Sequence, residues 1–157
     1  AMDDFANKKG GLWMIYQNVG ALIKGQAIIS LGSQATVQEA AEKMAEHRIG
    51  AIPVIDSGEL KGLFTERDLL NRVVAKGLRT QSTRLADVMT KDPITIGSDA
   101  SLVESFSTMF EHKFRHLPVL EEDRVVGVLS CRDIPANYQI MWENWVEAQN
   151  ALKVASG

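Results

Sequence analysis

Cysteine is almost absent from this sequence. The single residue, Cys131, excludes an intramolecular disulfide and offers no zinc-binding spacing, which is typical of proteins from a reducing cytosol. Long apolar runs are missing too. None approaches the roughly 18 residues that a membrane span requires, and the stretch 12–16 is too short for a signal-peptide core. We therefore expect a cytoplasmic protein that is not attached to a membrane.

The sequence also has little net charge and no cluster of reactive groups. Its 17 Lys and Arg and 20 Asp and Glu residues leave a net charge of −3, and the basic ones are scattered, so we expect no nucleic-acid partner. The Gly-rich phosphate loops and the Gly-x-Ser-x-Gly nucleophile motif do not occur. The three histidines have no Cys, Asp or Glu cluster at metal-ligand spacing. These absences predict a protein that is not an enzyme and holds no metal.

What the sequence does contain is a tandem duplication. Residues 29–69 align without a gap to residues 94–134, at a constant offset of 65 (94 minus 29). Identical pairs include Gly32 and Gly97, Glu39 and Glu104, His47 and His112, Pro53 and Pro118, Gly62 and Gly127, and Asp68 and Asp133. Because chance similarity rarely keeps its register for so long, we interpret the chain as two copies of one unit.

Both copies predict the same order of elements, β-α-β-β-α. The expected strands are 27–31, 51–55 and 60–64 in the first copy, and 94–96, 116–120 and 125–129 in the second. A helix begins at Thr36 and at Ser101, where a Glu three residues later completes a capping box. A second helix begins at Thr65 and at Ser130. The polar segment 78–85 is typical of a linker.

The C-terminal segment 136–153 predicts an additional amphipathic helix. One face of it carries Tyr138, Met141, Trp142, Trp145, Gln149 and Leu152. Three roles remain open for this face: packing on its own module, a homodimer interface, or contact with a target protein.

The most informative motif closes each copy, as Gly-Leu-Phe-Thr65-Glu-Arg-Asp68 and Gly-Val-Leu-Ser130-Cys-Arg-Asp133. Taken singly, each is a capping box. The same geometry also suits a nucleotide, because a helix N-terminus with its N–H groups attracts phosphate and the hydroxyl adds one hydrogen bond. A carboxylate accepts two hydrogen bonds, which matches the two hydroxyls of a ribose.

Together, the duplication, the two motifs and the strand pattern His-x-[Ile/Phe]-x-x-[Ile/Leu]-Pro-Val resemble a pair of CBS domains, the Bateman module. The resemblance covers residues 22–76 and 87–140, which leaves an N-terminal extension (1–21), a linker (77–86) and a C-terminal helix or tail (141–157). It implies an α/β (α+β) pseudo-two-fold pair with two clefts between the repeats. It also implies regulatory binding of an adenosine-containing ligand (AMP, ADP, ATP, NAD(H) or S-adenosylmethionine) and a disc-like homodimer.

The resemblance assigns a role to each matching residue. Ribose binding falls to Asp68 and Asp133, and phosphate binding to Thr65, Arg67, Ser130, Arg132, Arg115 and His116. The positions that flank adenine are Ile29, Ser30, Ile52, Pro53, Ile94, Thr95, Leu117 and Pro118. Because Arg115 and His116 replace Gly50 and Ala51 of the first copy, we expect stronger phosphate binding in the second motif's cleft. Pro135 predicts that the second motif's helix is cut to one turn.

Three functions follow from these observations. The first is an adenine-nucleotide sensor, with AMP as the leading ligand. The second is an interaction or oligomerisation module with vestigial clefts, which recruits a protein target through the tryptophan-bearing helix. The third is a nucleotide hydrolase or transferase, for which the sequence offers no catalytic group.

Overall fold

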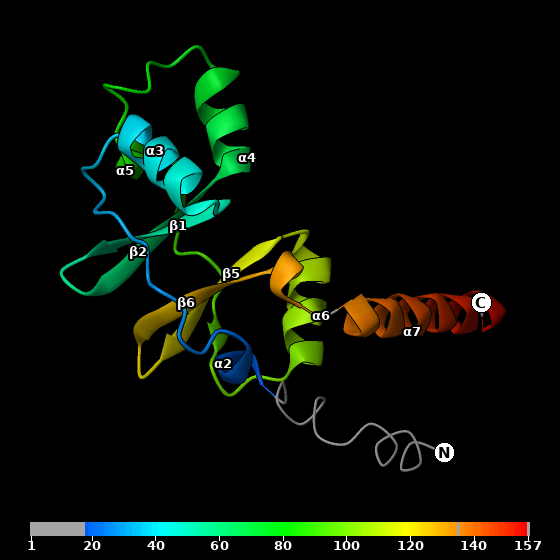
Figure 1. Ribbon diagram of the computed structural model, residues 1–157. Helices are drawn as coiled ribbons and strands as arrows, with labels where there is room; N and C mark the ends of the chain where they lie inside the picture. The colour runs from blue at the N-terminus through cyan, green and yellow to red at the C-terminus, as the bar shows by residue number, and fades with distance from the viewer. Residues whose placement is uncertain (1–17, 135, 157) are drawn as a thin grey trace.

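A computed structural model describes residues 18–134 and 136–156 of the chain. It consists of two α/β repeats, one above the other in Figure 1, and a C-terminal helix that leaves the second repeat. The predicted α+β fold with two copies of one unit is confirmed. Pro135 itself and residues 1–17 of the N-terminal extension lie outside the described residues.

The first repeat is built on the antiparallel hairpin of strands β1 and β2. Its elements are helix α3 (Val37–His47), β1 (Ala51–Asp56), β2 (Glu59–Thr65), helix α4 (Glu66–Asp68), the π-helix η2 (Leu69–Val74), helix α5 (Leu85–Val88) and β3 (Thr90–Lys91). Strand β3 pairs with the free edge of β2, which gives the sheet order β1-β2-β3. The predicted linker therefore contains the start of α5, whose Leu85 is fully buried in the core of this repeat.

The second repeat has the same hairpin with a different third strand. Its elements are β4 (Ile96–Gly97), helix α6 (Leu102–His112), β5 (His116–Glu121), β6 (Arg124–Ser130) and the 3-10 turn η3 (Cys131–Asp133). Strand β4 runs parallel to β5, and β5 is antiparallel to β6. The first predicted strand of copy one is wrong in extent: residues 27–31 form a single bridge, between Leu31 and Val54. Its other residues mostly line a cavity between the repeats instead of pairing.

Local capping signals fix where the long helices begin. The Thr36 hydroxyl accepts from the Glu39 N–H at 3.2 Å, and the Glu39 carboxylate accepts from the Thr36 N–H at 2.7 Å, so the predicted capping box is confirmed. In the second copy, the Ser101 hydroxyl accepts from the Glu104 N–H at 3.1 Å. Both helices stop at a residue in the left-handed conformation, Arg48 or Lys113, with φ of 54° and 57°.

The core of each repeat is completed by a short segment that directly precedes the other repeat in the sequence. We call these two segments the exchanged segments. The helix α2 (Val19–Leu22) precedes repeat one, yet Val19 and Ile23 are buried in the core of repeat two. The N–H groups of Val19 and Gly20 donate to the carbonyls of Ala100 and Ser98 at 2.9 and 2.7 Å. Figure 1 accordingly shows α2 below β6. In the same way, α5 precedes repeat two but belongs to the core of repeat one.

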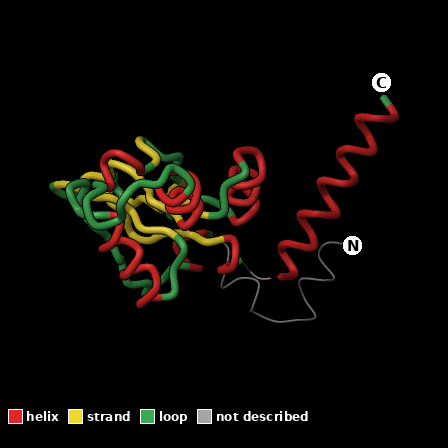
Figure 2. Tube along the Cα trace, turned by 90° about the horizontal axis from the view of Figure 1, so that it is seen from above, coloured by secondary structure: helices red, strands yellow, loops and turns green. Residues whose placement is uncertain are grey.

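The C-terminal helix α7 (Ala136–Ala155) is separate from both repeats (Figure 2). Its Ile140, Leu152 and Val154 are 58%, 63% and 82% exposed. The predicted helix is confirmed, whereas the side chains of Tyr138, Met141, Trp142 and Trp145 lie outside the described part of the chain. Within that part, no helix is both long enough and apolar enough to cross a bilayer.

Candidate functional site

Two cavities lie between the repeats. Each is lined by the Ser/Thr-x-x-Asp motif of one repeat and by the residues of the other repeat that lead from its long helix into the following strand. The Ser130 cavity has a volume of about 320 Å³, and its walls include residues 26–29 and 48–51 of repeat one and Ser130, Arg132 and Asp133 of repeat two. The Thr65 cavity has a volume of about 450 Å³, and its walls include Thr65, Arg67 and Asp68 of repeat one and residues 112–116 of repeat two.

In the Thr65 cavity, the hydroxyl–carboxylate pair is closed on itself. The Thr65 hydroxyl donates to Asp68 Oδ2 at 3.1 Å and accepts from the Asp68 N–H at 3.2 Å, while the Thr65 N–H donates to Asp68 Oδ2 at 3.0 Å. The other oxygen, Asp68 Oδ1, lies 3.4 Å from Arg72 Nε. Asp68 is 8% exposed, and both oxygens of its carboxylate have partners.

Arg72 connects the Asp68 carboxylate to the exchanged segment that contains α5. Its Nη1 donates to the carbonyls of Val88 and Met89 at 3.2 and 2.9 Å, so one guanidinium satisfies the end of α5 and pairs with Asp68. The equivalent position in copy two, 65 residues on, is Asn137. The ion pair is thus a feature of the Thr65 cavity.

In the Ser130 cavity, the same motif is shorter and more open. The Ser130 N–H donates to Asp133 Oδ2 at 2.8 Å, and the Ser130 hydroxyl accepts from the Arg132 N–H at 3.3 Å. The turn η3 ends at Ile134, which has extended backbone (φ −83°, ψ 126°), as expected for a residue before proline. The predicted single turn is confirmed. Asp133, unlike Asp68, is exposed.

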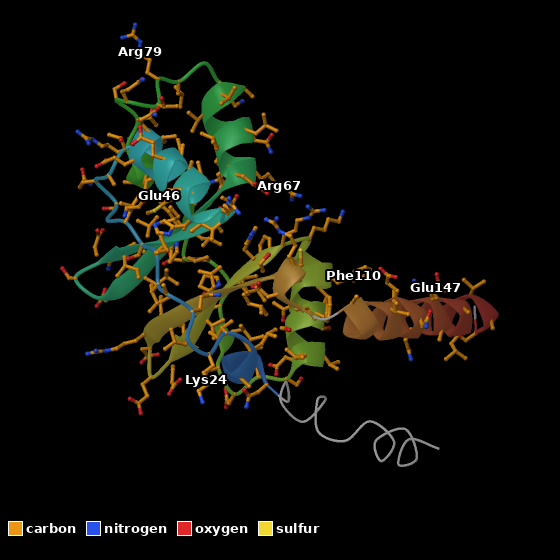
Figure 3. The ribbon with its side chains drawn as sticks, in the orientation of Figure 1. Lys24, Glu46, Arg67, Arg79, Phe110 and Glu147 are labelled. Carbon is orange, nitrogen blue, oxygen red and sulfur yellow. The ribbon has the colours of Figure 1, made fainter. Side chains whose placement is uncertain are left out.

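Cations surround both cavities, and the sequence reading missed two of them. Arg48 lines the Ser130 cavity and Lys113 lines the Thr65 cavity. They occupy equivalent positions, as left-handed C-caps at the ends of α3 and α6. The repeat alignment could have identified them, because both copies have a basic residue at this position. Arg67 extends toward repeat two (Figure 3), where its Nη1 donates to the Lys113 carbonyl at 3.4 Å.

The structure corrects the placement of Arg115. The sequence assigned Arg115 and His116 to the cleft of the second motif, but Arg115 lines the cavity of Thr65 and Asp68. The reason is the pseudo-two-fold packing, which places the start of the hairpin in one repeat next to the motif of the other repeat. His116 lines both cavities. Its burial lowers the pKa of the imidazole below the ordinary histidine value.

The residues expected to flank adenine divide into two groups. Ile29 and Pro53 line the Ser130 cavity, and Ile94 lines the Thr65 cavity. Ser30 and Thr95 are partly exposed and line neither cavity. Ile52, Leu117 and Pro118 are fully buried. Ile52 and Leu117 point into the two cores because alternate residues of a strand face opposite sides.

Among the described residues, no group of three or more His, Cys, Asp or Glu side chains is placed to hold a metal ion. What the cavities offer is a hydroxyl–carboxylate turn, several cations and apolar walls. This combination suits a small anionic ligand that has a hydroxylated part and a flat apolar part.

A protein-family model described as "CBS domain" matches residues 23–75 and 85–135. The chain is 34% identical over 110 residues to the CBS domain-containing protein YhcV of Bacillus subtilis, which covers 70% of this chain and 78% of that protein. It spans only 24% of a curated CBS domain-containing relative from Arabidopsis thaliana.

Solved structures show the same fold. A CBS domain protein from Pyrobaculum aerophilum, complexed with AMP, is 26% identical with a TM-score of 0.72, over 81% of this chain and 98% of that one. A CBS domain pair in complex with 5′-methylthioadenosine and S-adenosyl-L-methionine is 25% identical with a TM-score of 0.69, over 79% and 97% of the two chains.

Proposed function

Because the chain belongs to the CBS domain family, we propose that it is a regulatory module that senses an adenosine-containing nucleotide in the cavities between its repeats. Relatives in this family bind AMP, or S-adenosylmethionine and 5′-methylthioadenosine. These ligands share the adenosine group, and AMP is our leading ligand for this chain. We propose that the module has no catalytic activity of its own and acts through a protein partner or through its assembly state.

The observation that carries this proposal is the composition of each cavity. Both contain a hydroxyl and a carboxylate on one tight turn, at least two cations, and apolar side chains such as Ile29 or Ile94. The ribose diol suits the carboxylate, the phosphate suits the Arg groups, and the adenine suits the apolar wall. Both volumes fall in the range of about 300–1,000 Å³ that small-molecule pockets typically have.

The two cavities differ in how free their carboxylates are, so we propose that the Ser130 cavity binds the nucleotide more tightly. A ribose in the Thr65 cavity has to share Asp68 with Arg72, which lies 3.4 Å away. In the Ser130 cavity, Asp133 is exposed and holds the Ser130 N–H through Oδ2. Its carboxylate is therefore better placed to accept from a ribose.

A thermal-shift screen with AMP, ADP, ATP, NAD, NADH and S-adenosylmethionine tests the proposal. A ligand at 100 times its Kd adds about 2.7 kcal/mol of apparent stability. We expect Asp133→Asn to lose more of the shift than Asp68→Asn, because Asn is isosteric but a weaker acceptor for a diol. Glu121→Gln, at the exposed last residue of strand β5 and in neither cavity wall, is the matched control.

A protein that no adenosine compound stabilises would favour the second candidate, an interaction module with empty clefts that acts through α7. Turnover of any of these compounds would favour the third, an enzyme. Equal losses in the two Asn variants would contradict the ranking of the cavities alone.

We also propose that two copies of the chain form a homodimer. Leu70 and Val74, four residues apart on η2, are 60% and 59% exposed, and Leu78 beyond the helix is 44% exposed; Leu70 also lines the Thr65 cavity. Such an apolar row on the surface of a repeat is typical of a face that a second copy covers.

A further inference from the structure

His116 has a position that no other described residue shares, because it belongs to the walls of both cavities. It is the first residue of β5, opposite Ser130 of β6 in the hairpin register. Its ring is therefore held by the sheet between the two places where we propose that ligands bind.

The first repeat makes room for this ring. A Cβ atom added to Gly50 would lie 3.3 Å from His116 Cε1 and 3.2 Å from Glu66 Oε1, so the imidazole rests against the bare glycine backbone beside a carboxylate. At the position equivalent to His116, the first repeat has Ala51. The pair of repeats consequently has one imidazole at this position rather than two.

The charges that act on His116 come from both cavities. Arg132 and Asp133 line the Ser130 cavity, and Glu66 and Arg115 line the Thr65 cavity. Burial is the main cause that lowers the pKa of His116; Glu66 and Asp133 raise it, while Arg132 and Arg115 lower it. The ring thus experiences the electrostatic field of each site, through one cation and one anion from each.

We propose that His116 is a specificity-determining residue common to both sites, which favours ligands with a phosphate and couples the occupancy of one cavity to the other. This inference rests on the proposed function. A phosphate bound in either cavity adds negative charge and offsets the nearby Arg, which favours the protonated imidazole. The protonated ring then attracts a second anion in the other cavity.

The coupling has a defined sign and a defined pH range. Two bound anions repel each other, and the proton taken up by His116 offsets that repulsion. Below the pKa of the free protein, the ring is already protonated, so binding takes up no proton and nothing offsets the repulsion. Above the pKa of the ligand-bound protein, the ring stays neutral and only repulsion remains. Because coupling is reciprocal, each site changes the affinity of the other by the same factor.

Calorimetric titration with AMP, in two buffers of different ionisation enthalpy near neutral pH, measures the proton uptake directly. Beyond any proton exchanged by the AMP phosphate itself, which titrates at about pH 6, we expect wild-type protein to take up a fraction of a proton for each AMP bound, and to take up none with adenosine, which has no phosphate. His116→Gln should abolish the uptake and remove a coupling factor on the order of fivefold between the two binding steps. His47→Gln is the matched control, because His47 is exposed and lines neither cavity.

The outcomes separate this inference from the proposed function. If neither AMP nor adenosine binds, both are overturned. If AMP binds but uptake is absent in wild type, or persists in His116→Gln, the coupling is overturned while the proposed function stands. Loss of uptake in His47→Gln as well would show that the proton is not specific to His116, and would overturn the coupling too. Thermal unfolding of both variants checks that their folded state is intact.

Discussion

Gly62 and Gly127 open the repeated motif, and the structure gives them a packing role. A Cβ atom on Gly62 would lie 2.5 Å from Met89 Sδ and 2.8 Å from the Thr90 carbonyl; on Gly127 it would lie 2.8 Å from Ile23 Cδ1 and Gln26 Oε1. Both glycines thus allow the exchanged segment to lie directly on the sheet. A glycine that looked like part of a binding motif is also required for the fold.

Gly62→Ala should therefore destabilise the protein by about 1–3 kcal/mol, because its neighbours include backbone that cannot move aside. Urea unfolding followed by circular dichroism measures the difference. Gly97→Ala is the control, since its Cβ would meet the carboxylate end of Asp99, a side chain that can rotate away. Equal stability of the two variants would show that the close approach at Gly62 is not a constraint.

The sequence predicted which residues line the cavities better than it predicted which residues face one another across them. The repeat alignment identified Thr65, Asp68, Ser130 and Asp133 as the ends of two equivalent motifs, and both motifs line cavities. It could not show that Arg115 faces the first motif. Alignment reveals which residues are equivalent, whereas the partner of each depends on how the two copies pack.

At the scale of elements, short sequence patterns predicted the elements that depend on neighbouring residues. The helix starts and both hairpins follow from capping side chains and from alternating apolar residues, and the structure has them close to the expected residues. The π-helix η2 and the loss of the strand at 27–31 were not predicted. Both segments contact distant parts of the chain: Arg72 of η2 bonds to the end of α5, and residues 27–29 share a cavity wall with repeat two.

The exposed row on η2 gives a prediction at this scale. Val74→Glu introduces a charge into the proposed dimer face and should convert a dimer into a monomer, because an uncompensated charge is costly to bury between two copies. Light scattering coupled to size-exclusion chromatography measures the mass. Val154→Glu, at an 82% exposed position of α7, should leave the mass unchanged. Wild-type protein that is monomeric at micromolar concentration would exclude this dimer.

At the scale of the whole molecule, the two repeats depend on each other through their exchanged segments. Ile23 is 6% exposed in the core of repeat two, and Leu85 is fully buried in the core of repeat one. Neither belongs to the 41-residue stretch that the alignment matched, so the sequence did not indicate which core they complete. A core is defined by tertiary packing, which a repeat alignment does not describe.

Ile23→Ala and Leu85→Ala should each cost about 2–5 kcal/mol. We expect either variant to shift one cooperative transition for the whole molecule, since each substitution loosens a segment that joins the two halves. Hydrogen exchange measured on peptides from both repeats tests this. Independent unfolding of the repeat that carries the altered core would contradict it, and Leu152→Ala, on the exposed face of α7, should change stability by less than about 0.5 kcal/mol.

The exchange of α2 and α5 also bears on how such a chain could arise. In this chain the short helix in front of each repeat packs in the core of the other, so a single ancestral unit of one repeat and its helix would leave that helix without its partner core. Two such units would complete each other by trading helices, as a symmetric pair of separate chains. Duplication and fusion of the gene would then preserve the trade within one chain. The two halves could then diverge in sequence, as they have at the equivalent positions Gly50 and Arg115.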